Sequence, residues 1–153
     1  MKKVLSRGLL ALVAGFLLIQ LVPYGRNHTN PPVVSEPAWD SAQTRELAQR
    51  ACFDCHSNET TWPWYSNVAP ISWLVQHDVE EGRSKLNFST WGGGRQEVEE
   101  IGETIQEGEM PMPIFLVTHP EARLTEAEKQ ALISGLASTT GVGLGFEMEG
   151  END

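Results

Sequence analysis

The only two cysteines of this chain, Cys52 and Cys55, lie three positions apart, and His56 follows them directly. Cys-x-x-Cys-His is the spacing at which haem is attached covalently to protein. The thiols form thioethers with the vinyl groups of the porphyrin, and the histidine binds the iron as the proximal axial ligand. Because no cysteine is left for a disulfide, we expect one covalently bound haem c at Cys52, Cys55 and His56.

Other uses of a cysteine pair fit these residues less well. A tetrahedral zinc site needs further thiolates or histidines at matching spacings, which the sequence lacks. A redox dithiol of the thioredoxin kind requires strand–helix–strand surroundings, whereas the residues around Cys52 have a helical pattern. A chance pair beside a structural histidine is the remaining alternative.

The second axial position of the iron decides between electron transfer and small-molecule binding. Met110 lies in the run Gly-Glu-Met-Pro-Met-Pro, whose prolines restrict the backbone and stiffen the loop. We therefore favour Met110 as the second metal ligand. His77, Met112 and His119 are the alternative ligands, and an open position is a further possibility.

The first 25 residues have the pattern of a signal-anchor. They begin with Lys2, Lys3 and Arg7 and then carry no charge as far as residue 25, a length that just spans a hydrocarbon layer as a helix. No small-x-small cleavage site follows. We expect a single N-terminal membrane helix with its basic end in the cytoplasm.

This orientation places the rest of the chain in the periplasm, anchored to a bacterial inner membrane. Haem c is attached outside the bacterial cytoplasm, so the anchor and the motif agree. A soluble periplasmic protein, formed by cleavage of the signal, is the alternative.

Composition divides the remaining chain into three parts. Residues 26–38 contain three prolines and suggest an extended tether. Residues 39–141 suffice for one small domain, whose core a buried porphyrin would complete. Residues 142–153 have the composition of a disordered acidic tail.

Helical patterns account for most of the domain. Asp40 or Ser41 can cap a helix that runs to Ser57, and Thr125 and Glu128 form a capping box that begins a last helix ending near Ser138. Two more helices are expected at residues 71–85 and 95–106. No alternating strand pattern is present, so we predict an all-α domain.

Two stripes of small residues suggest that the first and last helices of the domain cross closely. Thr44, Ala48 and Ala51 form one stripe, and the other consists of Ala127, Ala131 and Gly135. The alternative is that alanine is present only because it favours helix formation. The tryptophans could line the porphyrin or fill the core.

Charge narrows the choice of partner. The chain carries 21 acidic and 11 basic residues, a formal net charge of −10, and every acidic residue lies after position 30. This excess argues against nucleic acid as a partner. It favours a redox partner protein with a basic docking surface; the alternative is that the charge only keeps the protein soluble.

The order of these parts resembles that of small class I c-type cytochromes, and the chain is more closely similar to the bacterial haem-binding domain family. The similarity lies in Ala51–Thr60, Trp62–Asn67, Ser72–Arg83 and Met110-Pro111. It implies a cytochrome c-like helical domain around one haem, attached at Cys52 and Cys55 with His56 as proximal ligand. The second ligand is assigned to Met110 only by its place in the Met-Pro loop.

The preferred function is that of a membrane-anchored periplasmic mono-haem c-type cytochrome, an electron carrier and not an enzyme. One alternative is a ligand sensor or a peroxidase-like protein with an open sixth position, in which His77 beside Asp78 would be the distal acid/base. Another is a haem subunit of a larger redox complex. A family resemblance identifies a cofactor and leaves the reaction undetermined.

Overall fold

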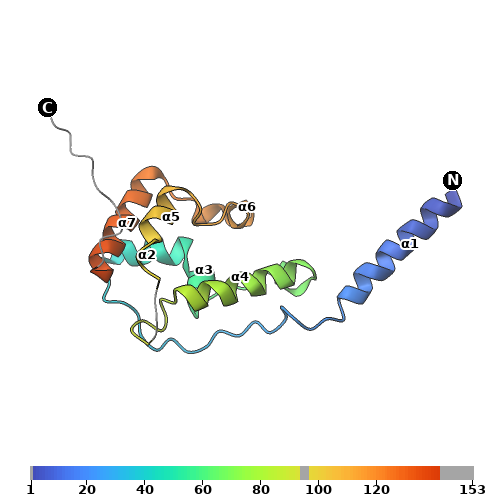
Figure 1. Cartoon of the computed structure of the whole chain (residues 1–153), viewed down its shortest axis with the longest axis horizontal. Coiled ribbons are helices and arrows are strands. Elements are labelled where there is room, and N and C mark those ends of the chain that lie inside the picture. Colours follow the sequence, from blue (N-terminus) through green and yellow to red (C-terminus); the bar gives the residue numbers. More distant parts are fainter. Residues whose placement is uncertain (1, 94–96, 142–153) are drawn as a thin grey trace.

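The computed structural model describes residues 2–93 and 97–141, and over these residues it contains helices and no strand. This confirms the predicted all-α class. Helices α2 to α7 gather into one body, while α1 stands apart from them (Figure 1). The expected acidic tail, residues 142–153, and residues 94–96 lie outside the described part of the chain.

The N-terminal helix forms, but the predicted membrane span is not supported. Helix α1 covers Lys2–Ile19, and among the helices described here none is long and apolar enough to cross a membrane. The physical reason is that the helix ends before the uncharged run does, while its first turns contain the basic residues Lys3 and Arg7.

The Cys-x-x-Cys-His motif lies at a break between two helices. Helix α2 covers Ala42–Ala51, and its N-cap is Ser41, whose hydroxyl accepts from the Thr44 amide at 3.1 Å. The predicted helix through Ser57 is interrupted, because Cys52 has a non-helical backbone (φ −124°) and a separate turn, α3, covers Phe53–His56.

Helix α7, Glu126–Thr140, crosses α2 as the small-residue stripes predict. Its capping box is present, with the Glu128 amide donating to the Thr125 hydroxyl and the Thr125 amide donating to the Glu128 carboxylate. At the crossing, Gly135 faces the side chain of Thr44, which would collide with any Cβ at that position. The glycine therefore sets the distance between the two helices.

We expect Gly135→Ala to destabilise the domain by a net of about 1 kcal/mol. Overpacking costs typically 1–3 kcal/mol or more, which exceeds the gain in helix propensity of about 1 kcal/mol. Urea unfolding would measure the change, and Ser134→Ala on the exposed side of α7 is the control. If Thr44→Ala recovers none of the loss in the double variant, the proposed collision is not its cause.

The middle of the domain is formed by α4 and several short elements. Helix α4 covers Ile71–Lys85, as predicted, whereas α5 covers only Ile101–Gln106. The predicted start of this helix, residue 95, was too early. The Glu97 amide donates to the carbonyl of Lys85, the last residue of α4, instead of to a carbonyl within a helix of its own. Shorter turns complete the chain: η1 at Trp64–Asn67, α6 at Phe115–Thr118 and η2 at Pro120–Ala122.

The extended segment before α2 packs along the domain. In Figure 1 it runs beside α4 before reaching α2. Gly25, with φ +78°, lies against the Ser72 carbonyl, and the Asn30 amide group donates to the Thr60 carbonyl at 2.9 Å. The Val34 amide donates to the Ser89 carbonyl at 2.8 Å. Residues 25–35 thus pack on the domain, and over residues 26–34 the chain is extended, as the prolines of the predicted tether suggested.

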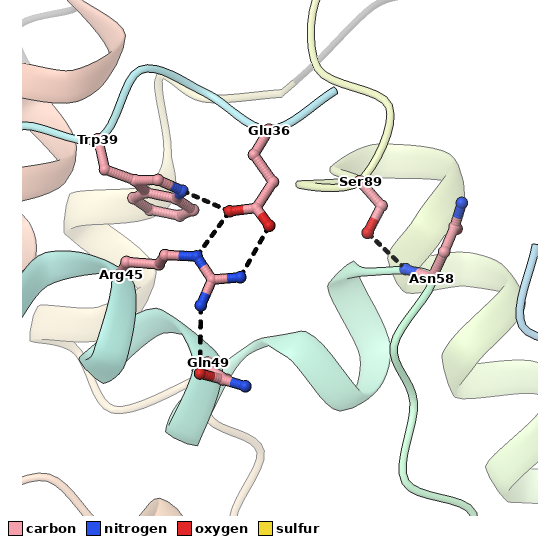
Figure 2. Close-up of polar contacts among 6 residues, drawn as sticks. All are labelled: Glu36, Trp39, Arg45, Gln49, Asn58 and Ser89. Carbon is pink, nitrogen blue, oxygen red and sulfur yellow. Dashed lines mark hydrogen bonds and ion pairs between the residues drawn. The ribbon is translucent and has the colours of Figure 1, made fainter. Parts of the chain in front are cut away.

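Glu36 joins the end of this segment to α2, as Figure 2 shows. Its carboxylate accepts from Arg45 Nε and Nη2 and from Trp39 Nε1, each at 2.7 Å. The hydrogen bonds from Arg45 hold the pKa of Glu36 below its ordinary value, against the opposing effect of burial.

Figure 2 also shows a contact between two loops. The backbone amide of Asn58 donates to the Ser89 hydroxyl at 2.9 Å, which joins the loop after the motif to the loop after α4.

We expect Glu36→Gln to lower the free energy of unfolding by about 1 kcal/mol at neutral pH, as for a partly exposed ion pair. Because the folded-state pKa is depressed, the contribution is complete above the ordinary value of 4.5 and is lost as the pH falls through the lower folded value. Urea unfolding of wild type and variant from pH 7 to pH 3 would measure this. A difference that does not shrink as the pH falls below 4.5, or one shared by the exposed control Glu46→Gln, would contradict the assignment.

Candidate functional site

The Cys-x-x-Cys-His turn is fixed on both sides. On one side Phe53 is 2% exposed and contacts the rings of Trp39 and Phe88, at centroid distances of 6.2 and 5.5 Å. On the other side α4 approaches so closely that a Cβ on Gly82 would lie 2.6 Å from the Cys55 carbonyl oxygen. The backbone of the motif is thus positioned by the core and by α4.

The ring of His56 is oriented by two backbone carbonyls. Its Nδ1 lies 3.1 Å from the Gly82 oxygen and 3.2 Å from the Leu86 oxygen. A carbonyl can only accept, so Nδ1 carries the proton and Nε2 keeps its lone pair. Burial lowers the pKa of His56, although these hydrogen bonds oppose the shift. A neutral imidazole with one ring nitrogen anchored by a carbonyl is typical of a histidine that binds metal.

Cys52 and Cys55 are free thiols in a half-buried environment. Burial raises the pKa of each to about 12, and for Cys55 the carboxylates of Asp78 and Asp54 add to the shift. Both side chains therefore remain protonated at neutral pH. They are available to form carbon–sulfur bonds and are poor candidates for a thiolate nucleophile.

Two adjoining cavities open beside the motif. The larger has a volume of about 390 Å³ and the smaller about 220 Å³. Five residues line both: Asp54, Cys55, Asp78, Met112 and Phe115. The rest of the larger wall is mainly apolar and includes Ile71, Leu74, Val75, Val79 and Ile114. The shared residues place the two cavities side by side along the motif, and the space beside Cys55 is mainly apolar in its larger part.

The structure brings most of the predicted ligands to this space. Cys52, Cys55, His56 and Met110 all line the smaller cavity, together with Met112. His119 lines only the larger cavity.

His77 lies elsewhere. Its side chain is 62% exposed, and its Nε2 lies 3.3 Å from Glu81. Of the pair that sequence analysis considered as a distal acid/base, only Asp78 faces the cavities.

Met110 lies in a loop that is attached to α5. The amides of Glu109 and Met110 both donate to the carbonyl of Thr104, at 2.9 and 3.0 Å. At the other end of the loop, the Leu116 amide donates to the Met112 carbonyl at 3.2 Å. Hydrogen bonds at both ends thus hold the backbone of the Met110 loop, beyond the stiffness that the prolines provide, while Met110 itself is 37% exposed.

Arg83 and Gly82 are site residues that sequence analysis did not identify. Arg83 donates from Nε to the Ser57 carbonyl at 2.7 Å and from its other nitrogens to Thr29, Asn30 and Thr60. Arg83 therefore joins the loop after the motif to the extended segment.

Gly82 could have been identified from the sequence as an isolated glycine inside a helical pattern. Such a glycine often has a packing reason, here the close approach of the α4 and motif backbones.

We expect Gly82→Ala to separate α4 from the motif. The added Cβ meets the backbone of Cys55, which cannot rotate away, so we predict a loss of about 2–3 kcal/mol in the free energy of unfolding. The His56 ring also loses its alignment with the Gly82 carbonyl. Urea unfolding and the yield of pigmented protein would measure both effects, with Ser84→Ala on the exposed face of α4 as the control. Wild-type values for Gly82→Ala would show that the close approach is unimportant.

These donors suit a porphyrin better than a bare metal ion. Over the described ranges, no group of three or more His, Cys, Asp or Glu side chains is arranged to hold a metal. The site instead combines two protonated thiols, an oriented neutral imidazole and a thioether with an apolar space. Thioether attachment at Cys52 and Cys55 and iron ligation by His56 Nε2 are compatible with every one of these features.

Comparison with known proteins finds a matching family. A family model described as Haem-binding domain matches residues 14–138, a range that begins within α1 and ends within α7. No curated protein and no solved structure matches the chain.

Proposed function

Since this chain belongs to the haem-binding domain family, we propose that it is a mono-haem c-type cytochrome that carries electrons. The observation that carries the proposal is the orientation of His56: with Nδ1 bonded to the Gly82 and Leu86 carbonyls, Nε2 is the nitrogen available to iron. Cys52, Cys55 and Met110 line the same cavity as this imidazole.

Each residue has a defined role in this proposal. The Cys52 and Cys55 thiols would each add sulfur and hydrogen across one vinyl group, which leaves a thioether and no leaving group. His56, through Nε2, and Met110, through its thioether, would hold the iron. The bound haem supplies one-electron cycling between ferric and ferrous iron. Val75, Val79 and Phe115 line the larger cavity and would exclude water from a bound porphyrin.

Electron transfer is favoured over catalysis because a methionine ligand closes the iron to substrates. The exposed position of His77 also leaves a peroxidase-like reaction without the distal base that was considered for it. We propose a periplasmic location, since haem c is attached outside the bacterial cytoplasm. The net charge of −10 supports a redox partner with a basic docking surface.

The mass and the near-infrared spectrum of one protein sample test the proposal. We expect protein produced with a c-type maturation system to be heavier than its polypeptide by one haem, and to show the near-infrared sulfur-to-iron band when oxidised. Colourless protein with the bare polypeptide mass would refute covalent haem. A haem protein that lacks the band and binds carbon monoxide at once would refute Met110 ligation and favour a sensor or peroxidase-like function.

A further inference from the structure

Asp78 places a carboxylate on the face of α4 that meets the motif. Gly82, one turn further along the helix, lies so close to the motif that an added Cβ would stand 2.6 Å from the Cys55 carbonyl oxygen. Because residues four apart share a helix face, Asp78 faces the motif as well. Asp78 and Cys55 are both half-buried, and both line the larger and the smaller cavity. The Asp78 carboxylate therefore belongs to the wall around the Cys55 side chain.

Within the described part of the chain, the Asp78 carboxylate has no hydrogen bond or ion pair. The other carboxylates beside it are engaged. Asp54 accepts from the Thr61 amide at 2.8 Å, and Glu81 lies 3.2 Å from the Lys85 ammonium group. A carboxylate without a partner is costly to keep in a mainly apolar wall. Such a group in a cavity is a candidate for a functional role.

The negative charge of Asp78 acts on one cysteine of the motif. Burial is the main reason that the pKa of the Cys55 thiol is raised, and Asp78 is the next cause, ahead of Asp54. For Cys52 the causes of the raised pKa are burial and Cys55. Burial also raises the pKa of Asp78 itself, and the adjacent His77 opposes that shift. The charge is thus directed at one of the two expected attachment points.

A charge at this place would change how readily a bound haem accepts an electron. The Cys55 sulfur belongs to the haem periphery once its thioether has formed. A nearby carboxylate favours the ferric form, because ferric haem carries one more positive charge than ferrous haem. The apolar wall strengthens this interaction, since the local dielectric constant is lower than that of water.

We propose that Asp78 lowers the reduction potential of the haem bound at Cys55, as a negative charge in the wall of the haem cavity. This inference rests on the proposed covalent attachment of haem at Cys52 and Cys55. It gives Asp78 an electrostatic role in place of the acid/base role considered for it beside His77, whose side chain is exposed. In this role Asp78 neither binds the iron nor transfers a proton.

Asp78→Asn is the first test, because it removes the charge and keeps the size of the side chain. At a given potential we expect its ferric-to-ferrous ratio to be about tenfold lower than in wild type, a rise of about 59 mV in reduction potential. Glu80→Gln is the matched control, an exposed position on α4 outside both cavities. It should change the ratio less than about twofold, since solvent and salt screen an exposed charge. Redox titration measures both variants.

A second variant separates charge from packing. Asp78→Glu keeps the negative charge, so we expect a potential close to that of wild type. Equal rises in Asp78→Asn and Asp78→Glu would overturn the inference, because packing would then be the cause. An unchanged potential in Asp78→Asn, or an equal rise in Glu80→Gln, would overturn it as well.

A measurement without haem keeps this inference apart from the proposed function. In haem-free protein, Asp78→Asn should speed alkylation of Cys55 by iodoacetamide severalfold, because the thiol then ionises more readily. Alkylation of Cys52 should keep its rate, each thiol being followed in a form whose other cysteine is serine. An unchanged rate at Cys55 would overturn the inference. Wild type that never acquires covalent haem would instead refute the proposed function, whatever the alkylation rates.

Discussion

The double substitution Cys52→Ser, Cys55→Ser is expected to yield a protein without covalently bound haem. A serine hydroxyl cannot replace a thiol in addition to a vinyl group, whereas its size preserves the packing of the half-buried positions. Mass spectrometry of the denatured protein should show the loss of one whole haem. Each single variant should keep one thioether and an altered visible spectrum.

The matched control for this prediction is His77→Ala, which changes an exposed histidine and should keep the full haem mass. Haem that remains attached to the double variant after denaturation would show that another side chain forms the bond. The interpretation of the motif would then be wrong, whatever the state of the fold.

Met110→Ala is expected to open the second axial position. Loss of the thioether should lower the reduction potential by on the order of 0.1 V or more, since axial ligands set haem potentials over a range of about 0.8 V. Ferrous protein should then bind carbon monoxide rapidly, and the near-infrared band of the oxidised protein should disappear. Redox titration and carbon monoxide mixing measure the two effects.

Met112→Ala is the appropriate control, because Met112 lines the same cavity and lies two residues away. It should leave the potential and the near-infrared band unchanged. The opposite result, an open iron in Met112→Ala and wild-type behaviour in Met110→Ala, would assign the ligand to Met112. Because the hydrogen bonds of Glu109 and Met110 to Thr104 use backbone atoms, neither substitution removes them.

Local sequence signals predicted the elements whose causes are local. The capping box at Thr125 and Glu128, the bounds of α4 at Ile71–Lys85 and the Ser41 cap are all present. The crossing of α2 and α7 also followed from the small-residue stripes, because Gly135 permits an approach that larger residues prevent. Helix α5 was predicted too long, since the pairing of Glu97 with Lys85 competes with helix formation.

Hydropathy alone did not predict the bounds of α1, because an uncharged run does not establish where a helix ends. The prolines before residue 38 likewise did not show whether this segment packs on the domain. They exclude helix, but only the hydrogen bonds of Asn30 and Val34 show that the extended chain packs on the domain.

The amino-acid sequence by itself determined the chemistry that this chain can support, because the types and spacing of Cys52, Cys55 and His56 are properties of neighbouring residues. Tertiary structure decided which atoms are free to act. The carbonyls of Gly82 and Leu86 select the available nitrogen of His56, and the direction of α4 turns His77 away from the cavities. Such contacts join residues that are distant along the chain, and their geometry exists only once the helices have packed.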